Sequence, residues 1–368
     1  MDFPSQNLSE KNQNLQSENR RLRERILELY VQINTLSSIS DELGINQTKP
    51  TESRYPIPKQ NKADIGTYKF VQSERTILPG GATYSAALEP KGENIAVASL
   101  SGTITILTSS LKSTATLRSH SLSCRDVYWS SSGLVSCGFD KKIKFWDLNT
   151  LTSQDIDADG LAHSIGGLEN DPNSIFVAAG DQIFWIDRRR QTPITIAAET
   201  QATAVTCYKN YLLFGGYDGF VNVVDRRSLN SGKISHIDIN GGPISSLSRV
   251  VDSTGFCIAT PSYTSPELLI IDESSNDIKR KKLNIDSPNR FGCRSDITDK
   301  SLIFDGDFAT ICGGKNATFW DGVQDSEPQL LDNVGGFIYG ALFMTNISQK
   351  VLTYSEDGIV SIWSLRQM

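Results

Sequence analysis

The chain contains 368 residues, of which 38% are hydrophobic and 21% are charged, and its 36 basic and 42 acidic side chains give a formal net charge of -6. This size and composition exclude a disordered chain, a collagen and a mini-protein, and they allow two ordinary domains or one large all-β domain. The acidic balance argues against a dedicated nucleic-acid binder, so we expect no nucleic acid among the partners. No apolar run approaches the roughly 18 to 20 residues of a membrane span, and the start lacks the features of a leader peptide, which favours the cytosol or nucleus.

A leucine recurs every seven residues near the start of the chain. This strict seam predicts a coiled-coil helix over residues 8–43 with leucine at the d positions. β-Branched residues at a positions with leucine at d favour a parallel dimer, whereas a helix docked on the rest of the chain usually has a wider apolar stripe. The predicted dimer contacts are Leu8, Leu15, Asn19, Leu22, Ile26, Leu29, Ile33, Leu36 and Leu43.

Residues 44–66 form the next segment. They are polar, include Pro50, Pro56 and Pro58, and show no hydrophobic period, which predicts a flexible linker. A short docking motif around Tyr55 is the alternative interpretation.

From residue 67 onward, short β-branched runs alternate with glycines and turn residues, which is typical of strands. One strand pattern, ending in Trp-Asp or an apolar equivalent, recurs about every 43 residues, a period that resembles the WD-repeat family. We therefore predict an all-β fold, a seven-bladed WD-repeat β-propeller over residues 67–368, closed by a strand at residues 68–71 that joins the C-terminal sheet. The anchors of the recurring strand are Leu107, Trp146, Ile186, Val224, Ile271, Trp320 and Trp363.

His120 is the side chain that most resembles a catalytic base. It stands, however, at the spacing of the hydrogen-bonded tetrad that locks a WD-repeat blade, so we interpret it as structural. The predicted tetrad is His120, Ser136, Asp140 and Trp146.

No other segment has the spacing of a catalytic, metal or nucleotide site. The segment ICGGKNAT, residues 311–318, lacks the spacing of a phosphate-binding loop, and a turn explains its glycines better. The six cysteines never occur as C-x-x-C pairs, which indicates reduced, buried thiols. We expect neither an enzyme nor a cofactor or metal.

Two segments are candidate partner-binding sites. Phe139, followed by Lys141 and Lys142, occupies a turn where polar residues are usual, so its ring is either tucked between blades or displayed to a peptide. The run Arg188, Arg189 and Arg190 could contact acidic membrane lipid, as could the basic run 279–282, although solvated loops explain both as well.

Three stretches resemble the autophagy-related protein 16 family in its long, propeller-bearing form: SENRRLRERILELYVQIN, SCGFDKKIKFWDL and FGCRSDITDKSLIFDGDFATICGGKNATFWDG. The resemblance implies a non-catalytic scaffold that dimerises through its coiled coil. It also implies that the autophagy protein 12-5 conjugate is a partner, that autophagy protein 8 is lipidated as a result, and that peptide motifs bind the propeller face. A cytoplasmic protein recruited peripherally to forming autophagosome membranes is expected.

The same architecture also suits other functions. A transcriptional corepressor of the coiled-coil and WD-repeat kind, or a propeller that binds phosphoinositides directly, would need no different fold.

Overall fold

The computed structural model describes fourteen stretches of the chain, and they lie in the compact unit Ala63–Met368. The predicted coiled coil, its dimer contacts and the predicted linker lie outside these stretches. The described residues are 68–90, 94–168, 171–190, 192–227, 234–239, 242–249, 255–262, 264–272, 277–283, 291–298, 309–320, 329–331, 336–344 and 350–367.

The described strands form seven four-stranded sheets, which we number as blades 1 to 7. Blade 1 contains β2 (Thr83–Leu88), β3 (Asn94–Ser99), β4 (Thr103–Thr108) and β5 (Ser113–Arg118). Blade 2 contains β6 (Cys124–Ser130), β7 (Gly133–Gly138), β8 (Lys142–Asp147) and β9 (Thr152–Asp157). Blade 3 contains β10 (Ala162–Leu168), β11 (Asp171–Ala179), β12 (Gln182–Asp187) and β13 (Ile194–Ala197).

The remaining blades repeat this order. Blade 4 contains β14 (Ala202–Tyr208), β15 (Tyr211–Gly216), β16 (Phe220–Asp225) and β17 (Ile234–Asp238). Blade 5 contains β18 (Ile244–Leu247), β19 (Phe256–Pro261), β20 (Glu267–Asp272) and β21 (Asp277–Lys282). Blade 6 contains β22 (Ser295–Thr298), β23 (Ala309–Cys312), β24 (Ala317–Trp320) and β25 (Gln329–Leu331), and blade 7 contains β26 (Ile338–Phe343), β27 (Lys350–Ser355), β28 (Ile359–Gln367) and β1 (Tyr68–Ile77).

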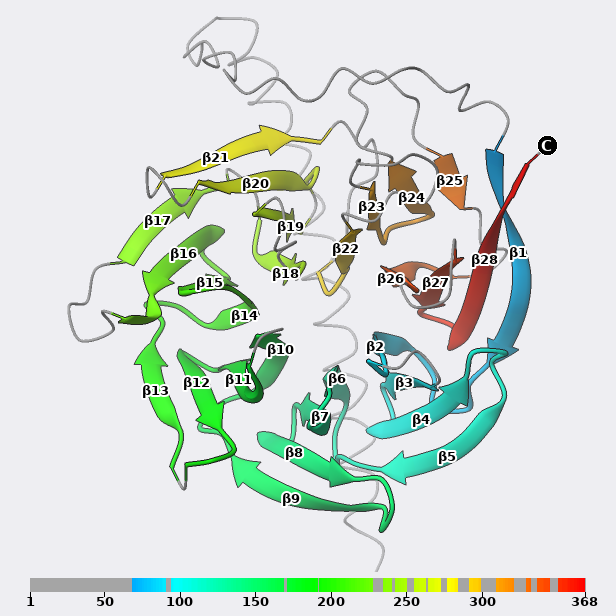
Figure 1. Ribbon diagram of the computed structural model, residues 1–368, viewed down its shortest axis with the longest axis horizontal. Coiled ribbons are helices and arrows are strands. Elements are labelled where there is room, and N and C mark those ends of the chain that lie inside the picture. Colours follow the sequence, from blue (N-terminus) through cyan, green and yellow to red (C-terminus); the bar gives the residue numbers. More distant parts are fainter. Residues whose placement is uncertain are drawn as a thin grey trace, which may run out of the picture. The chain divides into compact units, whose positions relative to one another are not determined.

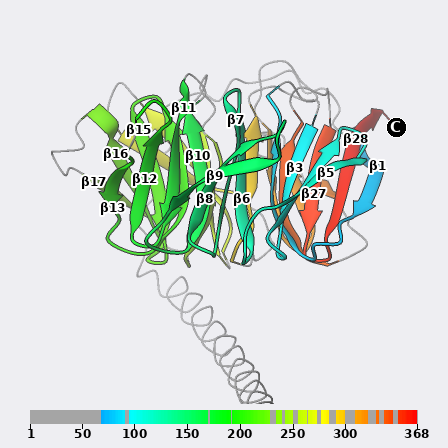
Figure 2. The ribbon, with the colours of Figure 1, turned by 90° about the horizontal axis from the view of Figure 1, so that it is seen from below.

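The blades form a closed ring in which each blade contacts the next and blade 7 contacts blade 1 (Figure 1). The first strand of each blade lies innermost and the fourth outermost, and the blades stand side by side in Figure 2. This architecture confirms the predicted seven-bladed propeller. All seven predicted anchor residues lie in the third strand of their blades.

Ring closure follows the predicted pairing of the two ends of the propeller. β1 runs antiparallel to β28, from Tyr68 opposite Gln367 to Ile77 opposite Ile359. The fourth strand of blade 7 therefore comes from the start of the propeller, so the last sheet is complete only when both ends are in place.

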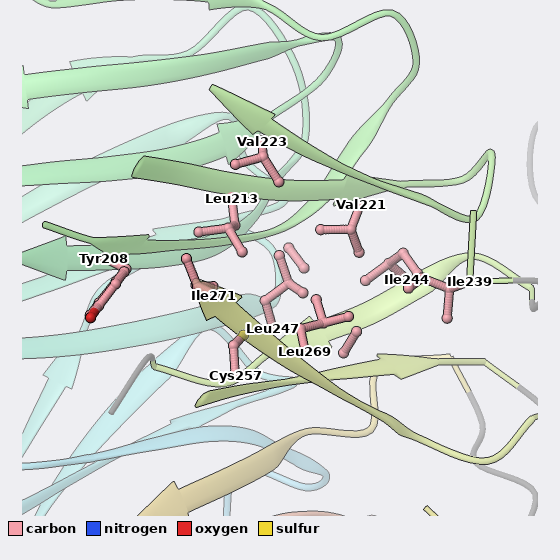
Figure 3. Packing of buried hydrophobic residues seen from close by; sticks show 12 residues of the cluster. Tyr208, Leu213, Val221, Val223, Ile239, Ile244, Leu247, Cys257, Leu269 and Ile271 are labelled. Carbon is pink, nitrogen blue, oxygen red and sulfur yellow. The ribbon is translucent and has the colours of Figure 1, made fainter. Parts of the chain in front are cut away.

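Burial explains the composition of the strands. Second and third strands are covered on both sides by neighbouring blades, so runs such as LLFGG in β15 are continuously apolar or small. The outermost β9, with the sequence TSQDID, is instead mostly polar, and only Ser153 and Ile156 in it are half-buried, because no further strand covers its outer edge. Figure 3 shows the packing between blades 4 and 5, where Leu213 and Val221 face Leu269. Each such buried side chain contributes about 1.5–3 kcal/mol.

Antiparallel strands place the loops on two faces of the ring. Face 1 carries the turns between second and third strands, such as residues 139–141, and the connections between blades, such as residues 119–123. Face 2 carries the turns between first and second strands and between third and fourth strands, such as residues 148–151.

Candidate interaction surface

A hydrogen-bonded chain fixes the turn of blade 2 on face 1. His120 Nδ1 lies 2.7 Å from Asp140 Oδ1, and Ser136 Oγ lies 2.9 Å from His120 Nε2. Trp146 Nε1 donates to the same Ser136 oxygen at 2.9 Å. Burial lowers the pKa of His120, although the hydrogen bond and charge of Asp140 act in the opposite direction. The four predicted tetrad residues thus lie together and hold the turn that carries Phe139.

Phe139 is half-buried at this turn. Its ring centroid lies 5.0 Å from that of His163, and the guanidinium carbon of Arg125 lies 5.1 Å from it. Lys141 beside it is exposed with a φ of 62°, and Lys142 Nζ pairs with Asp157 at 2.8 Å. The ring is therefore neither fully tucked between blades nor fully displayed.

Aromatic and arginine side chains from several blades meet Phe139 near the centre of the ring. The Tyr217 and Phe291 rings stack at 5.3 Å, and both make edge contacts with His163. On the other side, the Tyr84 ring lies 5.2 Å from the Tyr339 ring. We call this set the central cluster: Tyr84, Arg125, Phe139, His163, Tyr217, Phe291 and Tyr339.

β-Bulges position four of these side chains. In the first strands of blades 1, 2, 3 and 7, the register shifts across one residue, namely Tyr84, Arg125, His163 or Tyr339. A bulge leaves that residue outside the ladder and re-aims its side chain. Each bulge lies near the start of the first strand of its blade, which is the end at face 1. Ring and guanidinium contacts join the four side chains there, directly or through Phe139.

Arg294, next to β22, crosses the ring beneath this cluster. Its Nη1 lies 2.9 Å from Asp126 Oδ2 in blade 2, and its Nη2 donates to the carbonyl oxygens of Arg125 at 3.1 Å and His163 at 3.2 Å. One side chain from the edge of blade 6 thereby ties together blades 2 and 3, and fixes the backbone at two of the bulges.

The other predicted partner-binding residues lie on face 2. Arg189 pairs with Asp187 and Asp171, each at 2.8 Å, and Arg190 lies 3.8 Å from Asp187. Arg188 donates to the Ser132 carbonyl and lies 5.4 Å from the centre of the Phe145 ring. The structure therefore separates Arg188, Arg189 and Arg190 from Phe139, Lys141 and Lys142, and it places carboxylates beside the first run.

Sequence reasoning missed the rest of the central cluster. Tyr217 had a signal, because Tyr217-Asp218-Gly219 repeats in blade 4 the aromatic-Asp turn of Phe139-Asp140 in blade 2. Arg125 and His163 had none, since a bulge is defined by pairing with another strand and not by residue type.

Two kinds of feature are absent from the described residues. They contain no group of three or more side chains suited to hold a metal ion. They also contain no helix long and apolar enough to span a membrane.

Comparison with known proteins gives this chain no family. No protein-family model matches it, and no curated protein sequence matches it significantly.

Proposed function

We propose that this chain is a non-catalytic protein-interaction scaffold whose propeller binds peptide motifs of its partners at the central cluster. The convergence of aromatic and arginine side chains from several blades on face 1 supports this proposal. Aromatic residues and arginine dominate the energetics of protein interfaces. Tyr217 is 44% exposed, and face 1 also carries the exposed Leu100 and Leu122.

We further propose that the scaffold serves autophagosome formation, coupling the autophagy protein 12-5 conjugate to membranes or cargo so that autophagy protein 8 is lipidated. The resemblance of residues 17–34, 136–148 and 291–322 to the autophagy-related protein 16 family supports this finer assignment. In this proposal residues 8–43 dimerise the cytoplasmic chain, and Arg188–Arg190 on face 2 is its candidate contact for acidic lipid.

The first experiment is a pull-down of autophagy protein 5, free and conjugated, by the purified full chain. A Leu22→Pro, Leu29→Pro variant interrupts the predicted helix, and a Thr48→Pro, Glu52→Pro variant places the same substitutions in the predicted linker. We expect binding by the full chain and the linker variant, and a loss of binding by the helix variant.

Absence of binding by a well-folded dimer would contradict the autophagy assignment and favour the corepressor alternative, which predicts accumulation in the nucleus. A matched pair of propeller variants tests the interaction surface separately. Phe139→Ala and Tyr217→Ala should each weaken capture of peptide partners at least tenfold, whereas Leu151→Ala, on face 2, should not.

A further inference from the structure

The guanidinium of Arg125 is buried in the central cluster, and none of the described carboxylates forms an ion pair with it. Its residue is 9% exposed, and its ζ carbon lies 4.1 Å from the centre of the Tyr84 ring and 5.1 Å from that of Phe139. Its Nε, buried in the cluster, has no hydrogen-bond partner in the described part of the chain. An unpaired buried donor costs free energy, so such an atom in a native protein calls for an explanation.

The carboxylate next to Arg125 is already saturated. Asp126 Oδ1 accepts from the Ser85 hydroxyl at 2.6 Å and from the Val127 amide at 2.9 Å. Asp126 Oδ2 accepts from the Ile165 amide at 2.7 Å and pairs with Arg294 Nη1 at 2.9 Å. Four contacts fill both oxygens, so Asp126 has no free acceptor for Arg125.

Among the described residues, the charges around Arg125 therefore do not balance. Arg125 and Arg294 supply two positive charges and Asp126 one negative charge, because His163 beside them is neutral at pH 7. His163 Nε2 is also buried and lacks a hydrogen-bond partner among the described residues. The net charge of these groups is thus +1, and Arg125 Nε and His163 Nε2 are unpaired. Such a site suits a ligand with one negative charge that accepts hydrogen bonds.

The backbone of Gly292 lies directly against the guanidinium of Arg125. Gly292, with a φ of +97°, lies so close that an added Cβ would come within 3.1 Å of Arg125 Nη2. Any other residue at this position would crowd the edge of the guanidinium and strain the backbone.

We propose that Arg125, with His163 beside it, receives the side-chain carboxylate of an aspartate or glutamate in a partner peptide. This inference rests on the proposed peptide-binding function and adds the chemistry of the ligand. Tyr217, Phe291 and Tyr339 supply the apolar surface for the flanking residues of that peptide, so a free small anion would lack most of the contacts. The single negative charge of a carboxylate neutralises the net positive charge of Arg125, Arg294 and Asp126, whereas a phosphate dianion would add a second negative charge.

The test begins with random twelve-residue peptides displayed on phage and selected on the purified full chain. We expect the selected peptides to combine an aromatic residue with an acidic residue at a fixed spacing. A synthetic copy of one such peptide is then measured by calorimetry, with the acidic residue unchanged or replaced by its amide. The amide should bind roughly 10- to 100-fold more weakly, the usual effect of losing a hydrogen bond to a charged group.

Protein variants complete a double-mutant cycle. Arg125→Gln should weaken the binding of the acidic peptide by a similar factor and leave the affinity of the amide peptide nearly unchanged. Arg118→Gln removes the same charge from the exposed outer strand of blade 1 and should change neither affinity. The comparison of the acidic and amide peptides uses only the unchanged protein. It therefore still tests the carboxylate site if Arg125→Gln does not fold.

The two proposals fail in different ways. Peptides that need Phe139 but show no acidic preference, and no response to Arg125→Gln, would overturn the carboxylate site and leave the peptide-binding function in place. Selection of no peptide at all would overturn both.

Discussion

Arg294 makes polar contacts across the centre of the ring, and we expect them to stabilise the fold. The side chain reaches Asp126 at 2.9 Å from the opposite side of the ring. We expect Arg294→Met to lower the free energy of unfolding by about 3–5 kcal/mol, because it leaves the Asp126 carboxylate buried without its cation. Urea denaturation measures the change, and Arg118→Met on the exposed outer strand should stay within about 0.5 kcal/mol of the unchanged protein. An equal loss in both variants would contradict a role for the pair.

His163 gives stability a pH dependence. Burial, followed by the charges of Arg125 and Arg294, lowers its pKa from 6.5 to about 4. Between these pH values His163 is protonated in the unfolded chain and neutral in the folded protein. The free energy of unfolding therefore falls as the pH decreases below 6.5. From pH 7.5 to pH 5 this residue alone should remove about 2 kcal/mol.

Urea denaturation at those two pH values, on the unchanged protein and on His163→Phe, isolates this contribution. The phenyl ring keeps the contacts with neighbouring rings and cannot be protonated, so the loss of stability in the variant should be about 2 kcal/mol smaller. The same loss in both proteins would mean that other groups cause the pH dependence.

Among individual residues, the sequence predicted some side chains of the candidate site and not others. Phe139 stood out because an aromatic residue occupies a turn where polar residues are usual. Arg125 and Arg294 did not, because the spacing of a repeat describes the inside of one blade, and these two arginines act between blades that are far apart in the chain.

Among the strands, β1 links the two ends of the propeller. Phe70 in β1 is 3% exposed, and its ring lies 4.8 Å from that of Phe319 in blade 6. Phe70→Ala should therefore lower the free energy of unfolding by about 3–5 kcal/mol through the cavity it leaves. Val71, the next residue, is 38% exposed, and Val71→Ala should cost about 0.5 kcal/mol. Denaturation followed by tryptophan fluorescence compares the two, and a similar small loss for both would show that β1 contributes little to closure.

The elements themselves were largely predictable. The recurring pattern predicted seven equivalent strands, and all seven anchors lie in the third strands of their blades, because packing between two neighbours requires apolar residues at the same place in each repeat. The bulges in the first strands escaped prediction, since a register shift such as that between Cys124 and Asp126 depends on β7 as much as on β6.

For the whole molecule, the six cysteines report on the integrity of the ring. All are at most 7% exposed. Burial raises the pKa of the thiols of Cys124, Cys137, Cys207, Cys257 and Cys312, to about 12 for Cys257 and about 11 for Cys312. We expect none to react with a thiol reagent in the folded protein at pH 8 and all six to react in concentrated guanidinium chloride. Absorbance of the released thiolate counts them, and rapid modification of one thiol in the folded protein would show that a blade opens independently.

Closure through β1 also sets an order of events during synthesis. The Ser73 hydroxyl in β1 donates to the Ile362 carbonyl in β28, 289 positions later in the chain. At about 5–20 residues per second, the ribosome needs roughly 15 to 60 seconds to make the intervening chain. Throughout that interval β28 has not been made, so the edge of β1 that pairs with it is unpaired. Other nascent chains could pair with this edge. A chaperone that shields strand edges would therefore act on this protein from the synthesis of β1 until the last blade has been translated.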